Sequence, residues 1–182
     1  MVDFSSYNAR STRDAVSLLR HNSDLYVHIS TDSVYDVCDP DIRQSDEGRP
    51  VREEDAVRPA EKQLRDLLST HHDYGHRKLE AEHELVIQRY NHSDGQLGIP
   101  YVILRLPDVL GPRDTTYRFW FYQLWLRLAA VLPSRPVTIP EHLLAQKNSF
   151  VYVADVAQLV LDAVEMARDN QSFTDQVFPL IA

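Results

Sequence analysis

The sequence predicts an α/β fold with a parallel sheet, and two observations support this class. Short apolar runs typical of buried strands, at residues 25–30 and 100–105, alternate with segments that have the hydrophobic period of amphipathic helices. A helix that connects two strands of one sheet nearly always makes a right-handed crossover, which leaves the strands parallel. With 182 residues, the chain is long enough for one domain with a hydrophobic core.

The composition is ordinary for a globular protein, with 43% hydrophobic and 25% charged residues. The net charge of -8 argues against a nucleic-acid-binding surface, which is typically basic. Cys38 is the only cysteine, so an internal disulfide is impossible, as in proteins of reducing compartments. No apolar run approaches the roughly 20 residues of a membrane span, and the polar N-terminus lacks a signal-like core. We therefore expect a cytoplasmic protein with no membrane segment.

Local patterns define the elements of the first half of the chain. In order, they are a short strand end or frayed terminus at 1–7, a helix over 12–21, a strand over 25–30, a loop over 36–58 and a short helix over 60–69. Ser11 or Thr12 can cap the first helix, because their hydroxyls can accept hydrogen bonds from free backbone N–H groups. The long loop is expected because its charged and proline-containing sequence has little periodicity.

Tyr74 and Lys78 form the most informative pair in the sequence. Asp73 can cap a helix over 74–91, in which residues four apart lie on one face. A lysine ammonium there can lower the pKa of a tyrosine hydroxyl, which is ordinarily about 10. A tyrosine tuned in this way can exchange a proton with a carbonyl or an alcohol near neutral pH. The alternative is a solvated pair of side chains on a helix surface.

Thr31 lies at the end of the strand predicted over 25–30 and completes a possible site. Its hydroxyl could hydrogen-bond the same substrate oxygen that Tyr74 protonates. Together with Lys78, these groups would suffice for hydride chemistry if a nicotinamide lay beside them.

The helix that carries Tyr74 also offers a candidate metal site. His72 and His76 are four residues apart, and Glu80 follows one turn later. No third or fourth ligand is obvious, so we favour three exposed polar side chains and expect no metal.

The second half continues the alternation of strands and helices. After a turn at Gly95 and Gly98, the expected elements are a strand over 100–105, a helix over 117–132, strands over 137–139 and 150–153, a helix over 155–168 and a strand that begins at 177. Aromatic residues occupy more than one face of the 117–132 helix, which core packing explains most simply. The alternative is a face shared with a missing lobe or with a second subunit in a homo-oligomer.

The order of these motifs resembles the extended short-chain dehydrogenase/reductase family, the NAD-dependent sugar epimerases and dehydratases. The matching segments are STDSVYD at 30–36, YGHRK at 74–78, LRLPDVLGP at 104–112 and SFVYVADVA at 149–157. The resemblance implies that residues 1–182 form one partial Rossmann-like domain, the C-terminal half of the doubly wound fold. It also implies parts of a small substrate lobe at about 112–148 and 170–182.

The resemblance gives each residue of the central set a role. Tyr74 would be the general acid/base, and Lys78 would hydrogen-bond the nicotinamide ribose and lower the pKa of Tyr74. Thr31 would orient the substrate oxygen. The implied partner is a small-molecule substrate, possibly a nucleotide sugar or a similar carbonyl or alcohol compound.

Further residues match the cofactor-binding positions of the family. Ser5 and Ser6 stand where the family has small residues beside the NAD ribose, and Pro107 matches the segment that passes the nicotinamide. The cofactor would be NAD or NADP. Ser33 stands where nucleotide-sugar dehydratases carry a glutamate, which argues against elimination of water.

The glycine-rich phosphate turn of the family is not found in the sequence. In such proteins this turn lets the backbone approach the pyrophosphate at a helix N-terminus. The glycines of this chain form no such pattern; they are residues 48, 75, 95, 98 and 111. We expect an N-terminally truncated chain whose cofactor site is incomplete and whose activity alone is weak. The alternative is a non-catalytic regulatory or scaffolding member of the same fold.

Overall fold

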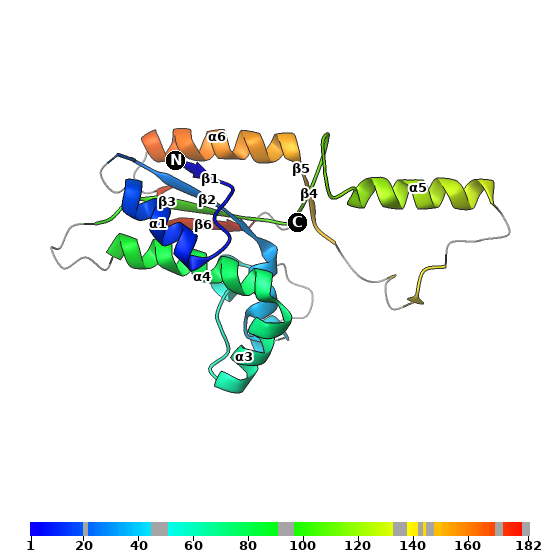
Figure 1. Cartoon of the computed structure of the whole chain (residues 1–182), viewed down its shortest axis with the longest axis horizontal. Helices are drawn as coiled ribbons and strands as arrows, with labels where there is room; N and C mark the ends of the chain where they lie inside the picture. The colour runs from blue at the N-terminus through cyan, green and yellow to red at the C-terminus, as the bar shows by residue number, and fades with distance from the viewer. Residues whose placement is uncertain are drawn as a thin grey trace.

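The computed structural model describes residues 1–19, 22–44, 51–90, 97–132, 138–141, 144, 148–169 and 173–179. Its elements, shown in Figure 1, are β1 (Val2–Asp3), α1 (Ala9–Leu19), β2 (Tyr26–Thr31), the 3-10 helix η1 (Asp32–Val37), α2 (Pro40–Gln44), η2 (Glu53–Asp55), α3 (Lys62–His71), α4 (Asp73–Tyr90), β3 (Tyr101–Leu106), β4 (Asp108–Leu110), α5 (Arg118–Val131), β5 (Phe150–Tyr152), α6 (Val153–Asp169) and β6 (Gln176–Pro179).

A parallel sheet of order β1-β2-β3-β6 is the centre of the fold, as predicted. The longest pairing joins β2 to β3, from Tyr26 opposite Tyr101 to Thr31 opposite Leu106. Every residue of these two strands is buried. Strands covered on both faces have apolar sequences with little alternation, which is why both were recognisable as continuous runs. Parallel pairing places the ends of β2 and β3 at the same edge of the sheet.

Helices cover both faces of the sheet, with α1 and α4 on one face and α6 on the other (Figure 1). Because strand side chains alternate between faces, the sheet separates two core clusters. The α6 cluster is Val27, Ile29, Val102, Leu104, Leu106, Val156, Val160 and Ala163. The cluster with α1 and α4 is Val16, Tyr26, Leu85, Ile99, Tyr101 and Ile103. The helix α4, which carries Tyr74 and Lys78, is therefore fixed against the sheet by core packing.

The expectation that the 117–132 helix packs in the core is wrong. No residue of α5 is buried, and Trp120 and Phe121 are 60% and 64% exposed. Figure 1 shows α5 extending away from the four-stranded sheet, beyond the β4-β5 pair. None of its residues belongs to the two core clusters on the faces of the sheet. None of the described helices is long and apolar enough to cross a membrane.

Local structure differs from the prediction in three further places. The segment predicted as a loop over 36–58 contains the end of η1, all of α2 and η2. Strand β4 was not expected, because its three residues gain their pairing only from β5, Asp108 opposite Phe150. Thr138 and Ile139 have no regular structure, so the described part of the 137–139 strand is not found.

Some predictions lie outside the described residues. These include the turn at Gly95 and parts of the predicted substrate lobe, residues 133–137, 142–143, 145–147, 170–172 and 180–182. The other predicted helices and strands are confirmed, with ends that differ by at most three residues where both ends are described.

His28 is an unusual residue for the centre of a sheet. Its side chain is fully buried in β2, and neither ring nitrogen has a hydrogen-bond partner among the described residues. Burial, together with the positive charge of Lys78, lowers the pKa of His28 to about 3. The ring is therefore neutral in the folded protein at physiological pH.

We predict that the protein loses stability on acidification below about pH 6.5, the ordinary pKa of histidine. Below that pH the unfolded chain binds a proton at His28, whereas the folded chain binds this proton only near pH 3, because its His28 has a pKa of about 3. The free energy of unfolding should fall by about 1.4 kcal/mol per pH unit from this residue. Urea unfolding of the parent and of His28→Leu between pH 7 and 4.5 measures this slope.

The variant should show a shallower slope, because leucine does not titrate and needs no hydrogen bond. The same measurement on a variant of the exposed His71, His71→Gln, controls for loss of a histidine without loss of a buried ring. Equal slopes for the parent and His28→Leu would contradict the prediction.

Candidate active site

A cavity of about 400 Å³ lies at the carboxyl ends of β2 and β3. Four of the six predicted site residues line it: Thr31, Tyr74, Lys78 and Pro107. Ligands of open α/β sheets bind outside the carboxyl ends of the strands, so this cavity has the expected location for a site. The fold thus brings together groups from β2, from α4 and from the residue that follows β3.

Gly75 explains how Tyr74 reaches the end of β2. At this residue the backbone of α4 lies directly against η1, the turn that follows Thr31. A Cβ atom at position 75 would lie 2.0 Å from the carbonyl oxygen of Ser33, so only glycine allows this approach. The Thr31 hydroxyl accepts a hydrogen bond from the backbone N–H of Ser33 at 3.2 Å, and its side chain lines the cavity together with Tyr74.

The pKa of Tyr74 is raised above its ordinary value, contrary to the prediction. Burial is the main cause, and the neighbouring Tyr7 and Asp32 raise the pKa further. The hydrogen bond from Thr31 and the charge of Arg118 act in the opposite direction but do not outweigh burial. The expected lowering of this pKa by Lys78 is therefore wrong.

Lys78 is almost fully buried, and its hydrogen bonds explain why it does not lower the pKa of Tyr74. Its Nζ donates to the carbonyl oxygens of Ser6 at 2.9 Å and Ile29 at 2.7 Å. It also lies 4.9 Å from the centre of the Tyr7 ring. The ammonium is thus directed at the backbone beside β1 and β2, where burial lowers the pKa of Lys78 despite the charge of Asp3.

Ser5 and Ser6 are not among the residues that line this cavity. The Ser5 hydroxyl and the backbone N–H groups of both serines donate to Oδ1 of Asp3, at 2.9, 2.8 and 3.0 Å. Ser6 contributes to the site through its carbonyl oxygen, which holds Lys78. Tyr7, the next residue, lines the cavity in their place.

Several charged residues at the cavity were not predicted as site residues. Asp32, Asp108 and Arg118 line it, and Arg118 forms an ion pair with Asp108. Burial raises the pKa of Asp32, and the carboxylates of Asp36 and Asp108 add to this effect. Asp32 follows Thr31 directly, which is a sequence signal for its position. Arg118 carries no such signal, because it begins a helix whose apolar sequence predicted core packing.

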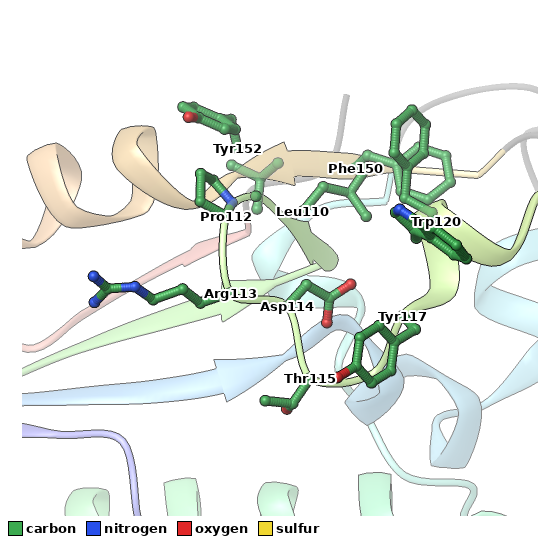
Figure 2. Close-up of a pocket in the computed structure, with 12 residues that line it drawn as sticks. Leu110, Pro112, Arg113, Asp114, Thr115, Tyr117, Trp120, Phe150 and Tyr152 are labelled. Atoms are coloured by element: carbon green, nitrogen blue, oxygen red, sulfur yellow. The ribbon is translucent and has the colours of Figure 1, made fainter. Parts of the chain in front are cut away.

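A larger cavity of about 750 Å³ lies between the loop after β4, the start of α5 and β5 (Figure 2). Figure 2 shows Trp120 and Phe150 on one side and the loop residues Arg113 and Asp114 on the other. A third cavity of about 420 Å³ shares Arg118 with the first cavity and Tyr117 with the second. The three cavities therefore adjoin one another along the loop between β4 and α5.

Within the described residues there is no group of three or more histidine, cysteine, aspartate or glutamate side chains arranged to hold a metal ion. The ring of His76 instead contacts Arg58, with Nδ1 at 2.8 Å from Nη2, and its Nε2 lies 3.6 Å from Oε1 of Glu80.

The parallel sheet and the cavity at its carboxyl edge define a Rossmann-like protein. The model of the NAD dependent epimerase/dehydratase family matches residues 1–175. The chain therefore belongs to the NAD-dependent epimerase/dehydratase family. No curated protein sequence gives a match to this chain.

Solved structures of two enzymes are similar in fold. UDP-glucuronic acid 4-epimerase from Bacillus cereus, in complex with UDP-glucuronic acid and NAD, has a TM-score of 0.58 at 24% identity, over 96% of this chain and 46% of that chain. UDP-N-acetylglucosamine 4-epimerase from Bacillus cereus has a TM-score of 0.54 at 18% identity, over 98% of this chain and 54% of that chain. At these identities the likeness shows the fold alone. The chain spans about half the length of these enzymes.

We predict that Gly75→Ala destabilises the protein. Glycine to alanine in a helix ordinarily stabilises it by roughly 0.5–1 kcal/mol. Here the added methyl group would overlap the Ser33 carbonyl, and overpacking typically costs about 1–3 kcal/mol. The sign of the change in unfolding free energy, measured in urea, therefore tests the contact between α4 and η1. Stabilisation by Gly75→Ala would show that the two backbones are not in contact.

Proposed function

We propose that this protein acts in NAD(P)-dependent epimerase, dehydratase or reductase chemistry on a nucleotide sugar or a similar carbonyl or alcohol substrate. The observation that carries the proposal is the shared cavity of Thr31, Tyr74 and Lys78 at the carboxyl edge of the sheet. Three groups from different elements line it, and Thr31 is close enough to Tyr74 to act on the pKa of its hydroxyl. Membership of the NAD-dependent family supports the same chemistry.

The residues of this cavity fit the nicotinamide end of the cofactor. An ammonium has three N–H donors, and the two backbone acceptors of Lys78 leave one for a ribose hydroxyl. Pro107, with Ile29 and Leu106, adds apolar surface suited to a nicotinamide ring. When bound, the nicotinamide would accept or return a hydride. The sequence contains no glycine-rich turn for the pyrophosphate, so we infer that this chain alone binds NAD weakly.

Tyr74 and Thr31 would handle the proton that accompanies the hydride. Because its pKa is raised, the Tyr74 hydroxyl is protonated at neutral pH. In this form it is suited to donate a proton to a carbonyl oxygen that is being reduced. Thr31 would hold the same oxygen, and the buried Lys78 would keep the first turn of α4 in place through its two backbone contacts.

The larger adjoining cavity suits the nucleotide part of such a substrate. Tyr117 and Trp120 offer aromatic faces on which a base can stack. Arg118 lines both the cavity that contains Tyr74 and the third cavity, which adjoins this one, whereas the Arg113 side chain extends away from the aromatic residues (Figure 2). Guanidinium groups bind phosphate oxygens through paired hydrogen bonds. Two Bacillus cereus enzymes of similar fold act on UDP-sugars, which supports this substrate class.

The proposal predicts turnover that depends on Tyr74. The chain would be incubated with UDP-sugars and an excess of NAD, and the products identified by NMR. We expect Tyr74→Phe to lower the rate by about 10²–10⁴-fold, the usual contribution of a general acid or base. Tyr90→Phe, at the far end of the same helix, is the matched control and should retain the rate of the parent. The proposal fails if turnover is absent at high NAD or survives Tyr74→Phe unchanged.

Weak cofactor binding gives a separate prediction for thermal unfolding. A ligand at 100 times its dissociation constant adds about 2.7 kcal/mol to the free energy of unfolding. We expect about 1 mM NAD to leave the unfolding midpoint of this chain unchanged. A clear rise of the midpoint would contradict the inferred incompleteness of the cofactor site, while leaving the roles of Thr31, Tyr74 and Lys78 open to the kinetic test.

A second candidate function is a regulatory or scaffolding role without catalysis. The observation that favours it is the exposed helix α5, whose large apolar side chains face solvent around its whole circumference. Light scattering after size-exclusion chromatography would then show a stable assembly at micromolar concentration, which Trp120→Glu should weaken. A monomer at all concentrations would argue against this role.

A further inference from the structure

A buried ion pair lies beneath the candidate active site. Arg105 of β3 and Glu82 of α4 are 4% and 3% exposed. The guanidinium donates from Nη2 to Oε2 at 2.7 Å and from Nε to Oε1 at 3.1 Å. This two-point geometry fixes the orientation of both groups, whereas a single contact would leave rotation free.

The pair also joins the elements that surround it. Ser30 of β2 donates from Oγ to Oε1 of Glu82 at 2.5 Å. Arg105 Nη1 donates to the Tyr35 hydroxyl of η1 at 2.9 Å and to the Glu53 carbonyl oxygen of η2 at 3.2 Å. One charged centre therefore connects β2, β3, α4, η1 and η2.

Each connection reaches a group of the candidate active site through a rigid element. Glu82 follows Lys78 by one helical turn and lies on the same face of α4. Ser30 directly precedes Thr31 in β2. Tyr35 belongs to η1, whose backbone contacts Gly75, the neighbour of Tyr74.

Stability alone does not explain such a pair. The desolvation of two charges roughly cancels their attraction, so buried pairs are often no more stabilising than apolar side chains of similar volume. Directional hydrogen bonds, unlike apolar contacts, do determine how α4 is placed along and across β2 and β3. We propose that the Arg105–Glu82 pair is a positioning device that holds Tyr74 and Lys78 in register with Thr31. Its importance for catalysis rests on the proposed function, but its effect on geometry does not.

The same helix offers a matched control. Arg89 of α4 pairs with Asp175, with Nε at 2.9 Å from Oδ2, and both side chains are mostly buried. This pair lies at the opposite end of α4 from Tyr74, beside the start of β6. Asp175 has a positive φ of 61°, a conformation that asparagine tolerates. Glu82→Gln and Asp175→Asn therefore each remove the carboxylate of one ion pair that involves α4, with little change in side-chain shape.

The experiment compares the two variants in the full chain by NMR with labelled tyrosine rings and threonine methyl groups. The parent should show a nuclear Overhauser effect between the Tyr74 ring and the Thr31 methyl group, assigned by its loss in Tyr74→Phe and Thr31→Ser. We expect Glu82→Gln to abolish this signal and Asp175→Asn to retain it, although both variants should be less stable than the parent in urea unfolding. Retention in Glu82→Gln, or equal loss in both variants, would overturn the proposal.

Two further variants keep the test decisive if Glu82→Gln does not fold. Tyr35→Phe removes one hydrogen bond of Arg105 without leaving a charge unpaired and should weaken the same signal. The double change Glu82→Leu with Arg105→Met replaces the pair by apolar volume and should fold while still losing the signal. A folded double variant with the parent's signal would refute the positioning role. Because this signal needs no substrate, failure of the proposed function would appear only in the activity assay.

Discussion

The approach of the first turn of α4 to η1 is the contact on which the rest of the site depends. A glycine at position 75 lets two backbones touch, and this places the Tyr74 side chain beside the end of β2. Without that approach, Thr31 and Tyr74 would belong to separate surfaces. The sheet also contributes, because parallel pairing of β2 with β3 brings Pro107 to the same edge as Thr31. The cavity is therefore the product of one close backbone contact and one strand pairing.

Electrostatics gives the site a definite resting state. Burial raises the pKa of Tyr74 and keeps its proton in place, while Lys78 donates to the backbone carbonyls of Ser6, which follows β1, and of Ile29 in β2. The two side chains thus have different environments, although they lie one helical turn apart. Lys78 contributes most directly to the placement of α4, and under the proposed function Tyr74 and Thr31 would handle the proton. This division of roles follows from where the hydrogen bonds go.

The sequence was sufficient for features that depend on local pattern. The parallel α/β class, the pair Tyr74 and Lys78 on one helix face and the position of Thr31 at a strand end were all predictable from period and spacing. Contacts between distant segments were not. Arg105 lies in a strand that was predicted from the sequence, but nothing local identified Glu82 as its partner. The burial of α5 was predicted wrongly because apolar composition shows what a helix can bury, and says nothing about whether a covering surface is present.

The complete burial of β2 and β3 has a consequence for how the chain finds its alignment during folding. Strands that alternate between polar and apolar residues resist slippage, since a shift by one position would expose the apolar side chains. Strands covered by helices on both faces lack this safeguard. The few hydrophilic side chains inside them, above all Ser30 and Arg105, can be satisfied in one alignment only. Buried polar residues, although unfavourable in a hydrophobic interior, thus favour the native register of β2 and β3.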